Sequence, residues 1–199
     1  MRMRGLERSL PGFTIVELLV GLAIAGTLAA IAVPTSLRTL DDFRTRSAAR
    51  YLASRLGDAR LRSIKRGYAI GLRFQAGADD YLVTTVADGN GNGLRTTEIL
   101  RGIDRALTES ETIGSHFAGV AFGILDEVPD ADGQPANGTD GVRVGVSRVL
   151  SMGPDGTSSS GTLYVHGQGR AQYAVRVLGA TGRVRVLKYD QLQRRWIDQ

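Results

Sequence analysis

The sequence predicts an α+β fold in which one long N-terminal helix precedes an antiparallel β domain. Residues 13–33 are apolar almost without interruption, and residues 35–66 repeat small or apolar residues every three or four positions. From Tyr68 onward, short runs rich in β-branched and aromatic residues follow one another between turns rich in glycine and aspartate. Strands in succession after one long helix are typical of an α+β protein with antiparallel sheet.

Length and composition limit the class of protein. The chain has 199 residues, 42% of them hydrophobic and 23% charged, which suits one domain with a packed core and argues against wholesale disorder. Its mean hydropathy is near zero, which excludes a polytopic membrane protein but allows a single anchor. The sequence contains no cysteine, so disulfides, thiolate metal sites and a cysteine nucleophile are excluded.

Charge is distributed in blocks along the chain. The net charge is +5, with nine Lys/Arg against three Asp in residues 38–66, and the same numbers in residues 143–199. Residues 67–142 have twelve Asp/Glu against four Arg. A basic chain favours an acidic partner only where the cations gather, and here they gather in two separate blocks and not in a uniform coat.

The first predicted element is a membrane-length helix. Residues 1–12 form a short basic segment, and the 21 residues from Phe13 to Val33 are apolar except for Glu17 and two threonines, Thr14 and Thr27. A helix of that length crosses a hydrocarbon layer of about 30 Å. The arginines before it favour a cytoplasmic N-terminus and an exported remainder. A buried core helix is the alternative, and the apolar composition on every helix face argues against it.

Glu17 is the exception in this run. A carboxylate inside a membrane-length helix costs on the order of 2–3 kcal/mol, so we expect it to have a partner. It lies within reach of a new amino terminus if the chain is cut after Gly12. Alternatively, it lies close enough to the interface to be hydrated.

The residues from Gly12 to Val20, Gly-Phe-Thr-Ile-Val-Glu-Leu-Leu-Val, resemble the class III signal of type IV pilins and pseudopilins. The resemblance implies that prepilin peptidase cuts after Gly12 and methylates the amino group of Phe13. It also implies that Glu17, at the fifth mature position, pairs with the N-terminal amine of a neighbouring subunit during filament assembly. Residues 1–12 would then be a leader peptide and residues 13–34 a transmembrane and assembly helix.

Gly26 and Pro34 are the residues of this helix that are expected to weaken it. Glycine lowers helix stability and proline removes one helical hydrogen bond, so the stretch between them could bend or unwind. The resemblance places both where members of the family often have helix-weakening residues. Pro34 could equally begin a new helical segment. As a rival to the pilin signal, Ala30-Ile31-Ala32 would allow cleavage after Ala32 and release of a soluble protein.

The next segment, residues 35–67, is predicted to continue as an amphipathic helix that lies against a sheet. Gly67 is expected to end it, after Lys65 and Arg66 in a last turn where cations suit the helix dipole. Its arginines are interpreted most simply as a solvated face, with acidic neighbours in an assembly as the alternative. The inward positions are predicted to be Leu37, Leu40, Arg44, Ala48, Leu52, Leu56, Ala59 and Ser63.

Residues 68–199 are predicted to form the antiparallel β domain. Residues 75–80 separate the first two runs as a hairpin connection, and residues 179–182 join the last two as a terminal hairpin. The predicted strands are Tyr68–Phe74, Tyr81–Ala87, Ile99–Ile103, Gly119–Leu125, Gly141–Val146, Val149-Leu150, Leu163–Val165, Gln172–Leu178 and Arg183–Tyr189.

Three segments of the β domain resemble the GspH/FimT branch of the pilin-like family. They are the Asp-Gly-Asn-Gly-Asn-Gly segment at 88–93, the Gly-Thr-rich loop at 154–161 with the strand after it, and the Gly-Arg hairpin at 181–186. The resemblance implies a minor subunit. The absence of cysteine agrees, because many major pilins have a C-terminal disulfide loop.

The sequence offers weak candidates for metal binding and for catalysis. Asp88, Asn90 and Asn92 have the spacing of a calcium loop, but Ile99 occupies the position of the bidentate glutamate, so a Gly/Asn turn is favoured. The acidic segment 126–140 is interpreted as a flexible loop, with calcium binding as the alternative. Neither of the two histidines, His116 and His166, has a recognisable pairing motif, and Ser158–Ser160 lie in a Gly-rich loop. We expect no cofactor, no metal and no enzymatic activity.

Nucleic-acid binding is the remaining hypothesis. Gly182-Arg183-Val184-Arg185 resembles the Gly-Arg-x-Arg motif linked with DNA capture in FimT-like minor pilins. Arg183 and Arg185 are two apart, so they share a strand face and could contact successive phosphates, with Arg176 and Lys188 adding charge. The simpler interpretation is a half-exposed strand whose arginines face water and whose valines face the core.

The sequence therefore predicts a non-enzymatic minor pilin or pseudopilin. Its expected place is the inner membrane, as a single-pass protein with its C-terminal domain in the periplasm, and then a type II secretion pseudopilus or a type IV pilus. Expected partners are prepilin peptidase, other pilins or pseudopilins, membrane lipid and, in the alternative function of DNA uptake, double-stranded DNA.

Overall fold

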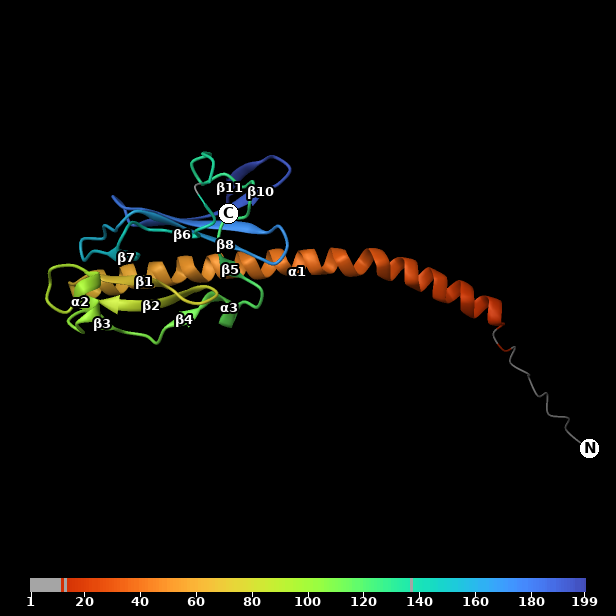
Figure 1. Ribbon diagram of the computed structural model, residues 1–199, viewed down its shortest axis with the longest axis horizontal. Coiled ribbons are helices and arrows are strands. Elements are labelled where there is room, and N and C mark those ends of the chain that lie inside the picture. The colour runs from red at the N-terminus through yellow and green to blue at the C-terminus, as the bar shows by residue number, and fades with distance from the viewer. Residues whose placement is uncertain (1–11, 13, 137) are drawn as a thin grey trace, which may run out of the picture. The chain divides into compact units, whose positions relative to one another are not determined.

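The computed structural model describes residues 12, 14–136 and 138–199. The chain divides into two compact units, and the division falls between Thr39 and Leu40. One 52-residue helix, α1 (Ile15–Arg66), runs through that division and is followed by antiparallel strands (Figure 1). The α+β class predicted from the sequence is confirmed.

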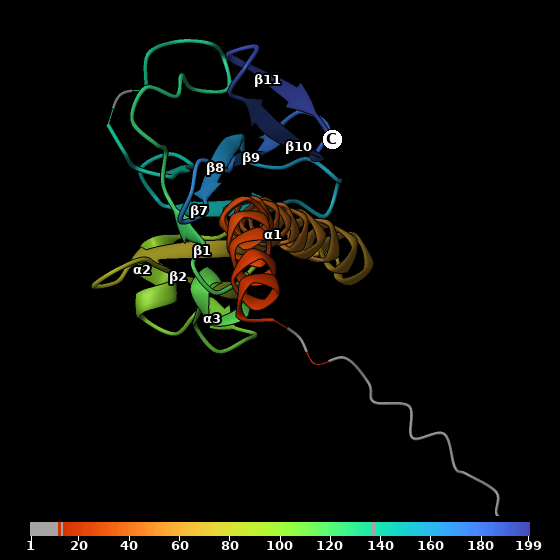
Figure 2. The ribbon, with the colours of Figure 1, turned by 90° about the vertical axis from the view of Figure 1, so that its right-hand side faces the viewer.

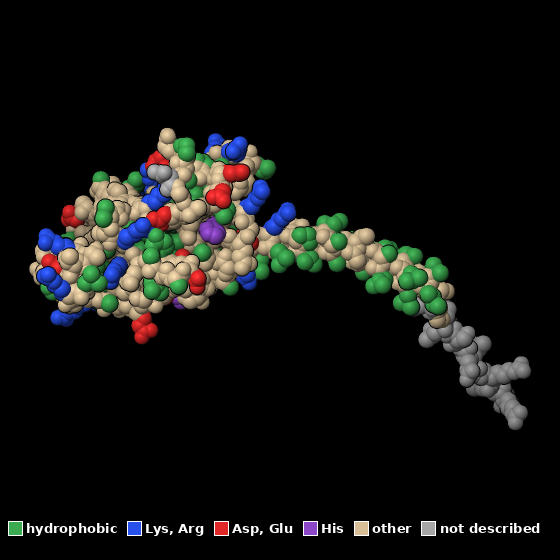
Figure 3. Space-filling view, viewed as in Figure 1, with side chains coloured by type: hydrophobic (Ala, Val, Ile, Leu, Met, Phe, Trp, Pro, Cys, Tyr) green, Lys and Arg blue, Asp and Glu red, His purple; other side chains and the backbone are tan. Residues whose placement is uncertain are grey.

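The N-terminal part of α1 exposes its apolar side chains. Every residue from Ile15 to Thr39 is exposed, including Leu22 and Ile31 at 70% each. Figure 3 shows hydrophobic side chains along this part of the helix. Among the described residues, α1 is the one helix long and apolar enough to span a membrane.

The C-terminal part of α1 buries one stripe of small and apolar residues in the β domain. The buried positions are Thr45, Ala48, Ala49, Leu52, Leu56, Ala59 and Ser63. The predictions that Leu37, Leu40 and Arg44 face inward are wrong, because all three are exposed and the buried stripe begins at Thr45. The predicted end of the helix is confirmed, since Gly67 has φ +75° and its N–H donates to the Ser63 carbonyl.

The first sheet lies next to this helix in sequence and is built on a hairpin. Strands β1 (Ile70–Ala76) and β2 (Tyr81–Ala87) pair antiparallel through the predicted turn. Strand β7 (Val149–Met152) joins β1, while the short strands β3 (Arg105–Ala106) and β4 (Glu111–Thr112) both pair with β2. The order β3-β2-β1-β7 thus brings the 149–152 segment beside the first strand.

The second sheet has the strand order β11-β10-β9-β8-β5, with β6 also paired to β8. Its antiparallel neighbours are all close in sequence except β5 and β6, and Figure 2 shows β8 to β11 in a layer separate from β1 and β2. The strands are β5 (Ala121–Phe122), β6 (Val142–Arg143), β8 (Gly161–His166), β9 (Gln172–Leu178), β10 (Arg183–Asp190) and β11 (Arg195–Asp198).

The main core joins the helix to both sheets. Leu52 and Leu56 of α1 belong to one buried cluster with Phe74 of β1, Leu150 of β7 and Tyr173 of β9. A second cluster lies around Tyr164, Tyr189 and Trp196, and it includes Val128 of the acidic segment. Val128, Ala131 and Ala136 of the acidic segment therefore pack on the second sheet, where the Trp196 indole donates to the Pro129 carbonyl at 3.0 Å.

Several predicted strands are shorter or different in the structure. The prediction of a strand at Ile99–Ile103 is wrong, because Thr96–Leu100 forms the short helix α2, and Gly102, just after its C-cap Arg101, has φ +74°. Three apolar residues without alternation do not specify a strand there, and local hydrogen bonds such as Ile99 N–H to the Arg95 carbonyl decide the outcome. Another one-turn helix, α3 (Ile113–His116), follows β4.

Two further predicted strands are much shorter in the structure. Gly141–Val146 forms a strand only at Val142–Arg143; Val142 and Val144 are buried, whereas Val146 after Gly145 is fully exposed. Gly119–Leu125 is reduced to β5. Strand β11 was not predicted, since the short segment at 195–198 has little periodicity of its own.

Candidate assembly helix and basic surface

The predicted site residues lie at three places in the chain. Gly12 and Glu17 flank the start of α1, Gly26 and Pro34 lie inside its apolar part, and the four candidate DNA-binding cations lie on β9 and β10. Phe13 and residues 1–11 of the predicted leader lie outside the described residues. Gly12 is described and is exposed.

Glu17 has a partner within its own chain. Its carboxylate accepts hydrogen bonds from the backbone N–H and the hydroxyl of Thr14, both at 2.8 Å, and its own N–H donates to the Thr14 hydroxyl at 3.2 Å. This reciprocal arrangement is a capping box, which satisfies free N–H groups at a helix start. The Thr-x-x-Glu spacing of a capping box is present in the sequence, although the cap was not predicted from it.

Gly26 and Pro34 do not interrupt the helix. Helix α1 continues through both, and a side chain at Gly26 would meet nothing within 4 Å. Hydroxyl groups beside the proline donate to carbonyls one turn earlier, Thr35 to Ile31 at 3.0 Å and Ser36 to Ala32 at 2.9 Å. These bonds satisfy backbone acceptors near the position where proline supplies no N–H.

The arginines of β10 lie on the solvent face of the second sheet. Arg183 and Arg185 are exposed, while Val184 and Val186 between and after them pack against the main core. The two arginines therefore share a face, as the strand period requires. This is also the arrangement that an ordinary half-exposed strand adopts.

Carboxylates accompany three of the four candidate cations. Arg185 pairs with Asp198 of β11, and this guanidinium holds the pKa of the Asp198 carboxyl below its ordinary value. Arg176 lies directly opposite Arg185 in the β9–β10 register and pairs with Asp132 at 2.7 Å. Arg183 has no ion pair within the part of the chain that the structure describes.

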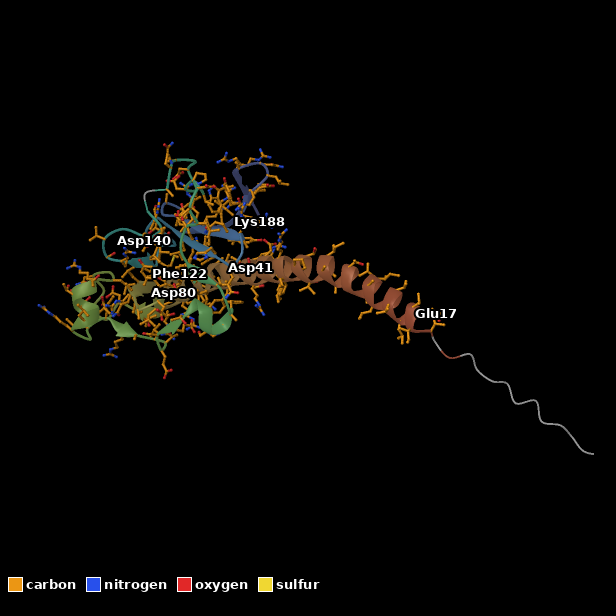
Figure 4. All side chains as sticks on the ribbon, turned by 45° about the vertical axis from the view of Figure 1, so that its right-hand side comes forward. Glu17, Asp41, Asp80, Phe122, Asp140 and Lys188 are labelled. Carbon is orange, nitrogen blue, oxygen red and sulfur yellow. The ribbon has the colours of Figure 1, made fainter. Side chains whose placement is uncertain are left out.

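Lys188 belongs to a cluster that fastens the helix to the second sheet. Its ammonium pairs with Asp42 at 2.8 Å and lies 5.7 Å from the centre of the Tyr173 ring. The Tyr173 hydroxyl donates to the same carboxylate at 3.1 Å, and burial and then Asp42 raise the pKa of Tyr173. Asp41 accepts the N–H groups of Gln168 and Gly169 at 2.8 and 3.1 Å (Figure 4).

This Asp41–Asp42 pair was not predicted from the sequence. A signal was present, since the two aspartates stand at the point where the apolar run has ended and the basic helix begins. Their partners, however, lie more than 120 residues away, and no local pattern indicates them.

The candidate calcium loop is closed by its own hydrogen bonds. The Asp88 carboxylate accepts the N–H groups of Asn90, Gly91 and Gly93 at 3.0, 2.8 and 2.7 Å. Burial alone would raise the pKa of Asp88, but these donors lower it, and the pKa lies below its ordinary value. The favoured Gly/Asn turn is confirmed. The described residues contain no group of three or more His, Asp or Glu side chains that could hold a metal ion.

Two further acidic residues connect the sheets. Asp140 pairs with Arg148 at 2.7 Å and accepts the Tyr81 hydroxyl at 2.8 Å. Asp80, in the β1–β2 turn, accepts the N–H of Phe122 on β5 at 3.1 Å, and burial raises the pKa of its carboxyl (Figure 4).

The histidines make separate local contacts. His116 Nε2 lies 2.7 Å from Glu111, which also pairs with Arg55 and accepts the Tyr51 hydroxyl at 2.9 Å. His166 Nδ1 lies 2.9 Å from the Gly167 carbonyl. Ser158–Ser160 contact backbone atoms of neighbouring strands and turns, such as those of Ser151 and Gly179.

Comparisons with protein-family models, with curated proteins and with solved structures find no match to this chain. The architecture itself is pilin-like: a long N-terminal helix exposes an apolar half and continues into antiparallel β-sheets.

Proposed function

We propose that the chain is a non-enzymatic minor pilin or pseudopilin. Prepilin peptidase cuts it after Gly12, and its N-terminal helix then anchors it in the inner membrane with the β domain in the periplasm. The same helix later assembles with those of other pilins or pseudopilins into a pseudopilus or a type IV pilus.

The observation that carries this proposal is the contrast within α1. From Ile15 to Thr39 no residue is buried, yet the same helix continues into a packed domain without a break. An exposed apolar helix of this length is stable only against lipid or against other apolar helices. A helix that first anchors the chain in a bilayer and later packs in a filament is covered by lipid before assembly and by other apolar helices afterwards.

The first test is the mature N-terminus after co-expression with prepilin peptidase. The proposal expects it at Phe13, with a methylated amino group found by mass spectrometry. Gly12→Val should prevent the cut, whereas Gly5→Val, a matched change elsewhere in the leader, should not. A mature terminus at Val33 would contradict the proposal and would support release of a soluble protein.

The second test separates the assembly role of Glu17 from its capping role. Glu17→Gln removes the charge that would pair with a neighbour's amine, while Thr14→Ala removes the intrachain cap and keeps the carboxylate. We expect filament incorporation to be lost in Glu17→Gln and kept in Thr14→Ala. Equal loss in both variants would assign Glu17 to capping alone.

DNA uptake through the β10 hairpin has weaker support. The carboxylates of Asp198, Asp132 and Asp42 compete with phosphate for Arg185, Arg176 and Lys188, and Arg183 alone of the four has no ion pair in the described chain. Duplex binding across a salt series would test this function, because phosphate contacts make affinity fall steeply with salt. Tight, salt-sensitive binding that Arg183→Ala/Arg185→Ala abolishes would favour it.

A further inference from the structure

We infer that the β domain carries a basic surface that docks on the anionic phospholipid headgroups of the membrane holding its anchor. We call this the headgroup surface. The inference rests on the proposed membrane anchoring, and it adds the bilayer surface as a partner of the domain. The headgroup surface consists of Arg170, Leu192, Arg194 and Arg195.

The position of this surface follows from a short series of contacts. Asp41 follows Pro34 by seven residues, so the length of the chain keeps it within about 25 Å of the end of the apolar run. Asp41 holds the β8–β9 turn through the N–H groups of Gln168 and Gly169. Gln191 then holds the β10–β11 turn to that turn, since its amide donates to the Arg170 carbonyl at 3.1 Å.

The charges of the headgroup surface differ from those of β10. Arg170, Arg194 and Arg195 are exposed, and none of them has a carboxylate within ion-pair distance in the described chain. The Arg195 guanidinium donates to the Gln193 amide oxygen, at 2.7 Å. Cations without a carboxylate partner keep their charge available for lipid phosphates, to which arginine can donate two hydrogen bonds at once.

An exposed leucine stands among these arginines. Leu192 is 96% exposed at the tip of the β10–β11 turn, which Asp190 holds by accepting the N–H groups of Leu192 and Gln193. A large apolar side chain held out to water beside cations is typical of surfaces that enter the headgroup region. On the helix near Asp41, Phe43 is likewise 66% exposed.

Two acidic residues moderate the charge. Asp126 and Glu127 line a cleft of about 510 Å³ together with Arg194. Docking is therefore expected to be weak and salt-sensitive, which suits a subunit that waits at the bilayer and leaves it on assembly. Each arginine removed should lower the ratio of docked to undocked domain roughly fivefold.

The test uses the full chain reconstituted in phosphatidylcholine vesicles with or without phosphatidylglycerol. Because the sequence has no cysteine, Leu192→Cys and, in a second sample, Val146→Cys each take one fluorophore. Val146 is the matched control, since it is also fully exposed but lies in the β6–β7 loop, outside the contacts described above. A neutral water-soluble quencher then reports the exposure of each fluorophore.

We expect the fluorophore at 192 to be shielded only in the vesicles with phosphatidylglycerol, and to become exposed again at about 1 M salt, where the Debye length is near 3 Å. The fluorophore at 146 should stay exposed throughout. Arg170→Gln/Arg194→Gln/Arg195→Gln should abolish the shielding, with the docked-to-undocked ratio falling on the order of 100-fold. Arg95→Gln/Arg101→Gln/Arg105→Gln, which removes the same charge at α2 and β3, should not.

Each other outcome overturns the inference in a recognisable way. Equal shielding in both lipids, or shielding that survives the triple change at the headgroup surface, excludes charge-dependent docking. Shielding at 146 as well indicates association of whole domains. Shielding by added duplex DNA but not by anionic lipid assigns the surface to nucleic acid. If the chain does not remain with the vesicles at all, the proposed anchoring fails, and not the headgroup surface alone.

Discussion

The two parts of helix α1 show how one element can serve two environments. From Ile15 to Thr39 all residues are exposed and mostly apolar, whereas from Leu40 to Arg66 a stripe of seven residues is buried. Leucine occurs in both parts, but only in the second does it contact a core of the chain itself. Both parts have a composition that favours a helix. They differ because the β-sheets of the domain cover one face of the second part, whereas the first part is exposed on every face.

The largest expected effect comes from the buried stripe. Leu52→Ala should lower the free energy of unfolding by about 2–5 kcal/mol, since Leu52 is 1% exposed and its removal leaves a cavity between helix and sheets. Leu22→Ala, in the exposed part of the same helix, should change it by less than about 0.5 kcal/mol. Denaturant unfolding of the full chain in detergent measures both. Equal effects would show that the apolar part also packs on its own domain.

A buried and an exposed serine hydroxyl, one in each part of α1, extend this comparison. Ser63 is fully buried and its hydroxyl lies 2.7 Å from the Tyr68 carbonyl and 2.8 Å from the Met152 carbonyl. Ser63→Ala should destabilise the domain by about 1–3 kcal/mol, because buried acceptors lose their donor. Ser36→Ala, which removes a bond to Ala32 in the exposed part, is the matched control and should have little effect on unfolding of the domain.

The pH dependence of stability distinguishes two carboxylates of the β domain, Asp88 and Asp80. The pKa of Asp88 is lowered in the folded state, so its contribution to stability is present above the unfolded pKa near 3.8 and is lost as the pH falls through the folded pKa. Asp88→Asn should therefore cost about 1–2 kcal/mol at pH 7 and progressively less on acidification. Urea unfolding at several pH values measures this dependence.

Asp80→Asn is the control of opposite sign. Burial raises the pKa of Asp80, so the folded state binds its proton more tightly, and the stability from this group falls as the pH rises from the unfolded to the folded pKa. Because an asparagine side chain cannot ionise, the stability of Asp80→Asn should not fall over this pH range. A parallel pH dependence in the two variants would contradict the assignment of separate causes.

The smallest effect is expected at the start of α1. Thr14→Ala removes the capping box with Glu17, worth about 1 kcal/mol to the local helix. Because no described residue of this part is buried, we expect faster hydrogen exchange in the first turn and no change in the unfolding of the domain. A lowered unfolding midpoint would show that the two parts of α1 are coupled.

Much of the fold could be predicted from local pattern. The bounds of Tyr81–Ala87 and Gln172–Leu178 were predicted correctly, as was the end of the helix at Gly67. The strand at Ile99–Ile103 was predicted wrongly, because side-chain contacts of Glu98 with Asn90 and Asn92 belong to a turn that holds a short helix. Short apolar runs leave such choices to their surroundings.

The candidate sites, too, could be predicted only in part from the sequence. The exposed face shared by Arg183 and Arg185 followed from the strand period, but the carboxylates that accompany Arg185, Arg176 and Lys188 did not. Those carboxylates come from β11, the acidic segment and the helix. Arg176 and Arg185 share one face of the second sheet, whereas Lys188, three residues after Arg185, lies on the opposite face with Tyr173, toward the helix.

By itself the sequence determined the anchor-length helix, its amphipathic continuation, the α+β class and the resemblance at Gly12 to Val20, because hydrophobic length and period are properties of neighbouring residues. Only the tertiary structure decided that Asp41 and Asp42 hold turns and strands more than 120 residues away, and which arginines keep their charge free of carboxylates. Such pairs depend on sheet register and on distances through space, which a local pattern does not contain.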